Sequence, residues 1–363
     1  MSGAGHTGTG APARPRRTRS AAPARGTVTI RDVARAAEVH PGTVSRALNE
    51  RTRALVNPAT VQRVLRAADR LGYRPNRIAR GLKTNRSHTI GVLIPDITNP
   101  LFPPILRGIE DRLDEAGYTS LIVNTDNDPE RERVYLDAMR GRQVDGFISA
   151  TARLDRELLA ELAAAGTPLV LVNRSLEDES VPAVTVDDRR GIALAVEHAV
   201  ALGHRQIGHV AGPQNLSTGH RRHLGFVEAM RRLGLEPPPE HIRFGAYFTA
   251  DQGARACAEL LDAAPELTAV IAANDMLALG CYDVFEQRGL SCPERISIVG
   301  FNDMPFVERL RPPLSTVRVP QREIGRVAAE LLLEQLSGKA EPAREILLEP
   351  TLIVRSSTAP PRA

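Results

Sequence analysis

The sequence predicts a mixed α + α/β chain, in which a small helical headpiece precedes two larger Rossmann-like lobes. Apolar residues recur at helical spacing between residues 30 and 71, and beyond residue 88 apolar strands alternate with helical stretches. The net charge changes sign at the same place. Residues 1–88 hold 18 Lys/Arg and 4 Asp/Glu, whereas the remainder of the chain holds 29 Lys/Arg and 39 Asp/Glu. A chain of 363 residues is also too long for one ordinary core, so two or three domains are expected.

The composition excludes several classes of protein. An apolar fraction of 42% and a charged fraction of 25% are typical of soluble globular domains, and no run of about 18 apolar residues is present to span a membrane. The N-terminus has no apolar segment of the kind found in secretory signals. Cys257, Cys281 and Cys292 are unclustered, which fits a reducing compartment. We therefore expect a cytoplasmic protein without a disulfide framework.

Residues 1–26 are predicted to form a disordered basic tail. They carry five arginines among Pro, Ala and Gly and show no hydrophobic periodicity. The positive charge of residues 1–88 suits a polyanion, which the negative remainder of the chain would repel. A basic segment alone is often only a solvated surface, but here it coincides with a helix-turn-helix pattern.

Residues 27–74 predict a three-helix headpiece of helix-turn-helix type. Thr29 is a good N-cap, and Asp32 is placed to complete a capping pair with it. Pro41 opens a second helix and Pro58 a third, because proline at the first helical position gives up only an amide that has no intrahelical partner. The apolar sides of the helices can close on one small core, which leaves the polar second helix free to enter a DNA major groove.

A series of motifs runs in order along the chain. The motifs are TVSRALN at 43–49, GYRPNRIARGL at 72–82, TIGV at 89–92, NPLF at 99–102, VDGFI at 144–148, LGHRQIG at 202–208, NDMLALG at 274–280, GFND at 300–303 and PLSTV at 313–317. Through them the chain resembles the lactose repressor (LacI/GalR) family of bacterial transcription regulators from about residue 27 to residue 360. Any one motif could occur by chance, but this order over the whole length is highly specific.

The resemblance implies that the second helix lies in the major groove of a near-palindromic operator. An arginine such as Arg46 can pair with guanine, worth about 1–3 kcal/mol of discrimination, although a contact to phosphate is the competing interpretation. Pro41 and Gly42 occupy the two leading recognition positions and have no side-chain donors, so base readout there is weaker or shifts to neighbours. The implied DNA-binding residues are Thr29, His40, Thr43, Ser45, Arg46, Asn49, Tyr73, Asn76, Arg77, Ala79, Leu82 and Lys83.

Residues 75–88 are implied by the resemblance to be a hinge helix and linker. The segment is too short to be a stable helix alone, and in the family it folds when two subunits meet on the operator. Leu82 is then the wedge inserted between minor-groove base steps. In the headpiece, Glu38 replaces the family's usual turn glycine, so a left-handed backbone there would cost about 1 kcal/mol unless the turn adjusts.

Residues 89–363 predict the α/β part of the chain. Near-continuous apolar strands such as 89–94, 146–149 and 269–272 alternate with helices, which is typical of parallel sheets covered on both faces. The resemblance implies two lobes of periplasmic-binding-protein type and a chain that crosses between them. We expect lobe one to comprise about 89–187 and 318–345, and lobe two about 188–317 and 346–360.

Two facing α/β lobes place the carboxyl ends of their strands around one cleft, where ligands bind. Arg222 is the leading candidate there, because its planar fork can clamp two hydroxyls or a carboxylate. The competing interpretations are that Arg222 pairs with a neighbouring carboxylate, that Phe102 and Phe248 are core residues and that Asn274 caps a helix. The effector contacts implied by the resemblance are Leu101, Phe102, Asn173, His220, Arg222, Phe248, Asn274 and Asn302.

Catalytic and metal-binding patterns are not found in the sequence. The histidines at 204, 209, 220 and 223 come without a clustered Cys or carboxylate set, so no metal site is expected. Neither a Gly-x-Ser-x-Gly elbow nor a Walker loop is present. We expect neither an enzyme nor a cofactor.

The sequence as a whole predicts a homodimeric, nucleoid-associated repressor whose operator affinity responds to a small molecule, a sugar or related metabolite. One alternative is a periplasmic sugar-binding protein, which the basic N-terminus and the lack of a signal segment disfavour. Another is an α/β enzyme, for which no acid, base or nucleophile constellation is found. A dimer is preferred to a tetramer because residues 351–363 hold no heptad tail. The sequence does not identify the effector or the operator, and it does not show whether the effector is an inducer or a corepressor.

Overall fold

A computed structural model describes residues 28–73, 86–155, 157–177, 180–339 and 344–362. The chain divides into two compact units, residues 1–79 and 80–363, each of which is described separately below. The predicted tail at 1–26 and most of the predicted hinge lie outside the described residues. So do five of the implied DNA-binding residues, namely Asn76, Arg77, Ala79, Leu82 and Lys83.

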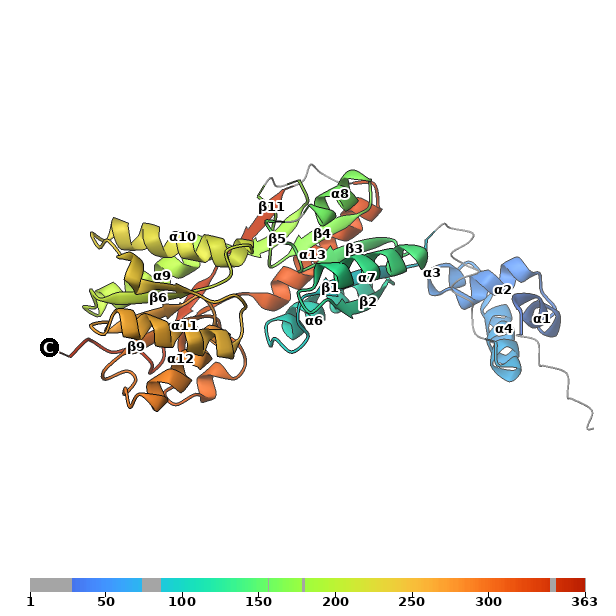
Figure 1. The fold of residues 1–363 in the computed structure, drawn as a ribbon. Coiled ribbons are helices and arrows are strands. Elements are labelled where there is room, and N and C mark those ends of the chain that lie inside the picture. The colour runs from blue at the N-terminus through green and yellow to red at the C-terminus, as the bar shows by residue number, and fades with distance from the viewer. Residues whose placement is uncertain (1–27, 74–85, 156, 178–179, 340–343, 363) are drawn as a thin grey trace, which may run out of the picture. The chain divides into compact units, whose positions relative to one another are not determined.

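The N-terminal unit is a helical headpiece, as predicted. Its described helices are α1 (Ile30–Ala36), α2 (Pro41–Leu48), α3 (Glu50–Arg53) and α4 (Pro58–Leu71). Helices α1, α2 and α4 lie against one another (Figure 1). They pack around Val33, Val44 and Val64, each fully buried. The one-turn helix α3 was not predicted, because a four-residue polar segment has no hydrophobic periodicity to identify it.

The cap of α1 has the predicted residues. The backbone N–H and the hydroxyl of Thr29 both donate to the Asp32 carboxylate, at 3.0 Å and 2.7 Å. These bonds lower the pKa of Asp32. The Thr29 side chain therefore takes part in the cap at the start of α1.

The turn between α1 and α2 does adopt the strained backbone expected at Glu38. Its φ is +53°, a left-handed conformation that glycine adopts more easily than other residues. We expect Glu38→Gly to stabilise the headpiece by about 0.5–1 kcal/mol, since the strain outweighs the added entropy of the unfolded chain. Hydrogen exchange of the α1 and α2 amides in the whole chain measures this. Glu38→Ala is the control, because alanine removes the side chain but keeps the strain of the left-handed backbone. A Glu38→Gly headpiece less stable than the Glu38→Ala headpiece would contradict the prediction.

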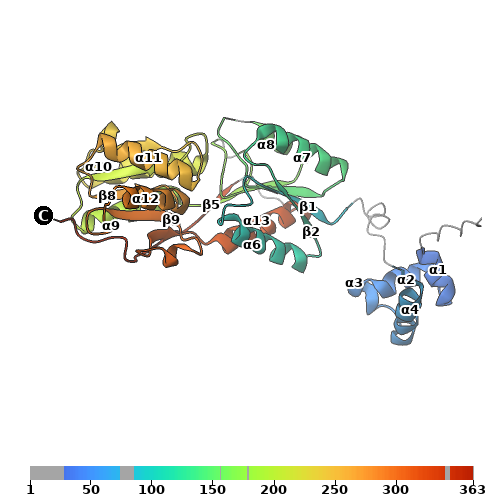
Figure 2. The ribbon, with the colours of Figure 1, turned by 60° about the horizontal axis from the view of Figure 1, so that its bottom comes forward.

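Lobe one is a six-stranded parallel sheet in the order β11-β5-β4-β3-β1-β2. Its strands are β1 (Thr89–Ile94), β2 (Thr119–Asn124), β3 (Gly146–Ser149), β4 (Leu169–Val172), β5 (Ala183–Val186) and β11 (Glu345–Leu348). The two faces are covered by different helices, because alternate strand residues point to opposite sides (Figure 2). One face carries α6 (Phe102–Glu115) and α13 (Gln321–Leu336), and the other carries α7 (Pro129–Gly141) and α8 (Leu158–Ala164).

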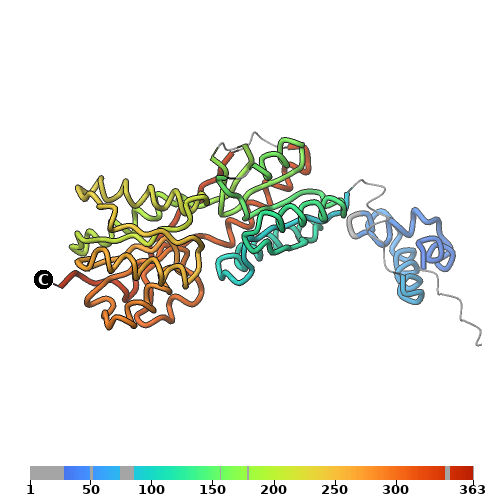
Figure 3. The backbone as a smooth tube through the Cα atoms, viewed as in Figure 1, coloured from blue at the N-terminus to red at the C-terminus, as the bar shows by residue number. Residues whose placement is uncertain are grey.

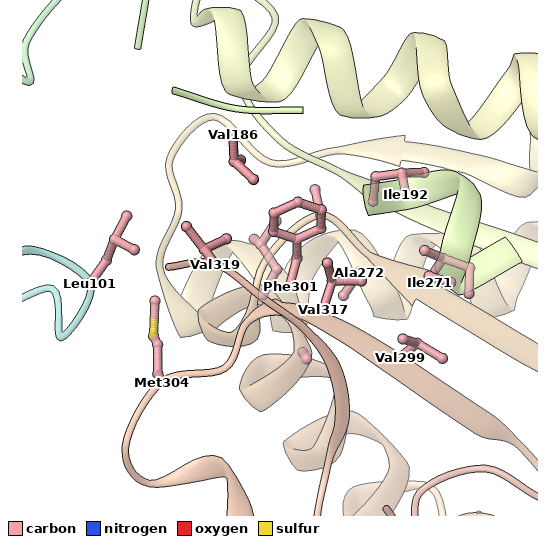
Figure 4. Packing of buried hydrophobic residues seen from close by; sticks show 14 of the residues in the cluster. Leu101, Val186, Ile192, Ile271, Ala272, Val299, Phe301, Met304, Val317 and Val319 are labelled. Atoms are coloured by element: carbon pink, nitrogen blue, oxygen red, sulfur yellow. The ribbon is translucent and has the colours of Figure 1, made fainter. Parts of the chain in front are cut away.

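Lobe two has a second six-stranded sheet, ordered β12-β10-β9-β8-β6-β7, with an antiparallel edge strand. Its strands are β6 (Ile207–Ala211), β7 (Ile242–Phe244), β8 (Ala269–Ala272), β9 (Ser297–Asn302), β10 (Ser315–Arg318) and β12 (Thr351–Ile353). Its helices pack in two pairs, α9 (Asp188–Ala201) with α10 (Ser217–Arg232) and α11 (Ala250–Ala263) with α12 (Asp275–Gln287). Figure 4 shows Phe301 of β9 among Val317 and Val319, in a core that also includes Ile271.

The chain passes between the lobes after Val186, after Arg318 and after Leu348 (Figure 3). Two predicted lobe limits are therefore corrected. Arg318 belongs to lobe two, because it is paired with Asn302 and Thr351 in that sheet. Residues 346–348 belong to lobe one, because β11 pairs with β5. Both strands lie next to a crossing, and sequence periodicity does not reveal which of two sheets a short strand joins.

Candidate functional site

The exposed face of α2 is the first candidate site. Ser45 and Arg46 are exposed, and the Arg46 Nε donates to the Gly42 carbonyl at 3.2 Å along the same helix. The His40 Nδ1 accepts the Gly42 N–H at 3.1 Å and so caps the helix. Because that ring nitrogen is occupied, any contact from His40 to DNA would come from Nε2.

The other described candidates of this unit have local roles as well. Thr43 is half-buried near the start of α2, and Asn49 is the C-cap of that helix. Tyr73 packs against the headpiece core and its N–H donates to the Ala68 carbonyl at 2.8 Å. Burial raises the pKa of Tyr73. Among the described candidates, Ser45 and Arg46 on α2 are thus exposed together with His40 and Thr29, whereas Thr43, Asn49 and Tyr73 are partly buried.

The second candidate site is a pocket between the two lobes. It has a volume of about 170 Å³ and is lined by residues from both sheets' carboxyl ends. Seven of the eight predicted effector contacts line it, namely Leu101, Phe102, Asn173, Arg222, Phe248, Asn274 and Asn302. The lobes touch beside it, where the Ser175 N–H donates to the Ser217 hydroxyl at 3.0 Å and the Leu154 N–H donates to the Asn215 carbonyl at 2.9 Å.

His220 is the exception among the predicted contacts, because it does not line the pocket. Thr218 and Arg222 are four residues apart on α10 and both face the pocket. His220 lies midway between them, and two residues of α-helix rotate a side chain by about 200°. The geometry therefore does not support a direct contact from His220.

Arg222 combines the two interpretations that the sequence left open. It is 2% exposed, and its Nε donates to the Asp188 carboxylate at 2.6 Å while Nη1 donates to the Ala273 carbonyl at 2.8 Å. Its guanidinium carbon also lies 3.8 Å from the centre of the Phe301 ring. Arg222 is thus fixed by a carboxylate and an aromatic ring and still borders the pocket.

Two polar atoms of lobe two are left without hydrogen bonds at this pocket. The Thr218 hydroxyl and the Asn302 Oδ1 are buried and have no partner among the described residues. Both residues line the pocket. Asn302 also has a φ of +116°, a conformation that is strained for any residue except glycine. Buried polar groups without partners are rare, so these two atoms mark positions where ligand hydroxyls can bind.

Asn274 caps a helix, which was the competing interpretation of this residue. Its Oδ1 accepts the Leu277 N–H at 2.8 Å and caps α12, although the residue also lines the pocket. Next to it, Asp275 accepts hydrogen bonds from the Thr316 hydroxyl at 2.6 Å and the Met304 N–H at 2.8 Å. Burial raises the pKa of Asp275 to about 7.

Aromatic side chains supply much of the apolar lining. Phe102 and Phe248 were predicted there, but Tyr247 was not. Phe248 lies against Gly212, where an added Cβ would approach the ring to 2.4 Å. Tyr247 and Thr249 belong to the segment between β7 and α11, which has no motif by which the sequence could have identified it.

Family models match both parts of the chain. Residues 29–76 match the model for bacterial regulatory proteins of the lacI family, and residues 196–358 match that for a periplasmic binding protein-like domain. Over 330 residues the chain is 36% identical to the HTH-type transcriptional repressor CytR of Escherichia coli (strain K12), covering 91% of this chain and 96% of that protein.

Solved structures of transcription regulators are similar to this chain over nearly its whole length. The Lac repressor dimer bound to operator and the anti-inducer ONPF has a TM-score of 0.81 and 28% identity, covering 92% of this chain and 100% of that one. The transcriptional regulator CelR in complex with cellobiose has a TM-score of 0.71 and 31% identity, covering 91% and 99%. No helix among the described residues is long and apolar enough to cross a bilayer.

Proposed function

Because this chain belongs to the lacI family of bacterial regulatory proteins, we propose that it is an operator-binding repressor controlled by a small molecule held between its lobes. The observation that supports this most directly is the occurrence, in one chain, of a helix-turn-helix unit and an interlobe pocket with unsatisfied polar atoms. The match of residues 29–76 to the lacI model distinguishes it from a periplasmic sugar-binding protein. Its relatives are transcription regulators, so we propose no catalytic activity.

In this proposal two headpieces of a homodimer bind the half-sites of a near-palindromic operator in the cytoplasm, at the nucleoid. The Lac repressor in the matching structure is a dimer on its operator. Ser45 and Arg46 would contact bases or phosphates from α2, and Leu82 would enter the minor groove. We place the remaining contacts at Thr29, His40, Thr43, Asn49, Tyr73, Asn76, Arg77, Ala79 and Lys83.

The effector in this proposal is a sugar or a related hydroxylated metabolite. CelR in the matching structure holds cellobiose. Here the aromatic rings of Phe102 and Phe248 can cover an apolar sugar face, while the Thr218 hydroxyl and Asn302 Oδ1 provide hydrogen-bonding positions. Because both lobes line the pocket, a bound molecule favours one arrangement of the lobes, and it changes operator affinity only through that differential binding.

Replacing Arg46 tests the DNA-binding half of the proposal. We expect Arg46→Ala to weaken binding to the DNA upstream of the protein's own gene by about 5- to 150-fold, the equivalent of about 1–3 kcal/mol. Gel-shift titration of the whole protein measures this. Arg70→Ala removes another exposed arginine of the same unit and is the control. Equal operator affinity for the wild type and Arg46→Ala would rule out the role of Arg46.

The control of DNA binding by a ligand is tested in the same assay. A panel of neutral and acidic sugars is added to the wild-type complex with operator, and one member is expected to change the affinity. If no ligand changes operator binding while the protein still binds DNA specifically, the effector half of the proposal is wrong.

A further inference from the structure

Arg174 is a buried arginine whose Nε has no hydrogen-bond partner in the part of the chain that the structure describes. It lies two residues after the end of β4, is 5% exposed and lines the interlobe pocket. Its Nε is buried and makes no hydrogen bond, and Glu132 attracts Arg174 electrostatically without a direct ion pair being found between them in the described residues. This differs from Arg222 on the opposite lobe, which pairs with Asp188.

The acidic groups around Arg174 have other partners as well. Glu132 accepts a hydrogen bond from the Thr151 hydroxyl, and burial raises the pKa of Glu132 although that hydrogen bond and the charge of Arg174 act to lower it. Asp155 is held by a bidentate pair with Arg153, at 2.9 Å and 3.0 Å. Burial, and after it the positive charge of Arg153, lowers the pKa of Arg174 to about 10, although Glu132 acts in the opposite direction.

The carboxylates that line the pocket are engaged as well. Asp96 accepts hydrogen bonds from the N–H and hydroxyl of Thr98, at 2.8 Å and 2.6 Å. Asp126 pairs with Arg131. A buried charge is strongly unfavourable unless it is paired, and Arg174 is balanced only by Glu132 among the described residues, whose own burial favours the neutral form, so an anionic ligand would supply a negative charge that Arg174 can pair with directly.

We propose that the effector carries a carboxylate or phosphate group that pairs with Arg174, so that the natural ligand is an acidic sugar or a sugar phosphate. This inference rests on the proposed effector site and specifies its ligand. The guanidinium fork of Arg174 matches the oxygens of either anion in a bidentate geometry. The hydroxylated ring of the same molecule then meets Thr218 and Asn302 on lobe two.

The two ends of such a ligand contact different lobes. Arg174 follows a strand of lobe one, whereas Thr218 and Asn302 belong to α10 and β9 of lobe two. The anionic group therefore binds one lobe and the hydroxyls bind the other. A neutral sugar would leave Arg174 with Glu132 as its only charged counterpart among the described residues, and would therefore stabilise the ligand-bound arrangement of the lobes less.

Inorganic phosphate is the simplest probe of the anion site. We expect millimolar phosphate to raise the melting temperature of the wild-type protein saturably and Arg174→Met to lose at least ten-fold in phosphate affinity. Arg174→Lys keeps the charge and should retain part of the binding. Arg205→Met is the control for net charge, because Arg205 precedes β6 and so lies at the edge of the sheet opposite the pocket. Equal stabilisation of the wild type and Arg174→Met, or of neither, overturns the proposal.

Matched ligands then distinguish the two anions and separate this inference from the proposed function. Calorimetry compares glucose with glucose 6-phosphate and glucuronate, and ribose with ribose 5-phosphate and ribonate. An acidic member is expected to bind the wild type at least ten-fold more tightly than its neutral parent, and Arg174→Met should abolish that preference. If a neutral sugar binds both proteins equally and shifts operator affinity, the ligand class is wrong while the effector site stands. If no ligand shifts operator affinity, the effector site itself is wrong.

Discussion

Replacing Arg222 with alanine is expected to lower the free energy of unfolding of lobe two by about 3–5 kcal/mol. The substitution leaves the Asp188 carboxylate, which is 2% exposed, without the guanidinium that holds it at 2.6 Å. It also removes the donor to the Ala273 carbonyl and the cation over the Phe301 ring. Hydrogen exchange of the β6, β8 and β9 amides measures the loss within the whole protein.

A double variant separates the structural role of Arg222 from its role in the pocket. Arg222→Met with Asp188→Leu removes both charges, and replacing a buried ion pair with apolar residues of similar size is often neutral or stabilising. We expect this protein to fold, to bind operator and to have lost its response to effector. A double variant as unstable as Arg222→Ala would show that the contacts to Ala273 and Phe301, and not the unpaired carboxylate, account for the effect.

Lowering the pH from 6.5 to 4.5 is expected to destabilise lobe two by about 2 kcal/mol through His209 alone, because the unfolded chain takes up a proton on this histidine over that range and the folded chain does not. His209 is fully buried, which lowers its pKa to about 3, although its Nδ1 bonds the Ile271 carbonyl at 2.8 Å. The unfolded chain binds the proton near pH 6.5 and the folded chain does not. The contribution of His209 to stability is therefore complete above pH 6.5 and falls as the pH drops toward 3.

A variant without a titratable group at position 209 isolates the contribution of His209 to the pH dependence of stability. His209→Phe keeps a ring against Phe226, whose centroid lies 4.6 Å from that of His209, but leaves the Ile271 carbonyl without its donor. We expect a penalty of about 1–3 kcal/mol that is constant with pH, so the difference from the wild type should shrink between pH 6.5 and 4.5. Amide exchange in β6 and β8 at several pH values measures it. A difference that stays the same over this range would show that His209 does not remain neutral.

Most of the architecture could be predicted from sequence because its signals are local. The caps at Thr29 and Pro41 and the apolar strand at 89–94 depend on neighbouring residues, and the structure has these elements in place. The left-handed turn at Glu38 was also foreseen as one of two outcomes. The fold class and the family are confirmed by the comparisons, since the order of motifs extends over nearly the whole chain.

The pocket could be predicted in part. Residues that follow strands, such as Asn173 and Asn302, are identifiable because parallel strands place their carboxyl ends at one edge of the sheet. Tyr247 lies in a segment without such a signal. His220, a predicted effector contact, does not line this pocket, because the positions implied by the resemblance do not state which side of α10 each residue occupies in this chain.

The sequence by itself determined the helix-turn-helix unit, the two α/β lobes and most of the cleft residues, because periodicity, caps and motif order are properties of neighbouring residues. The tertiary structure alone decided which charges are paired. Asp188 and Arg222 are 34 residues apart and meet in the structure, whereas the Arg174 Nε has no hydrogen-bond partner among the described residues. The pairing of a buried charge depends on which side chains the fold brings within a few ångströms, and linear spacing does not contain that distance.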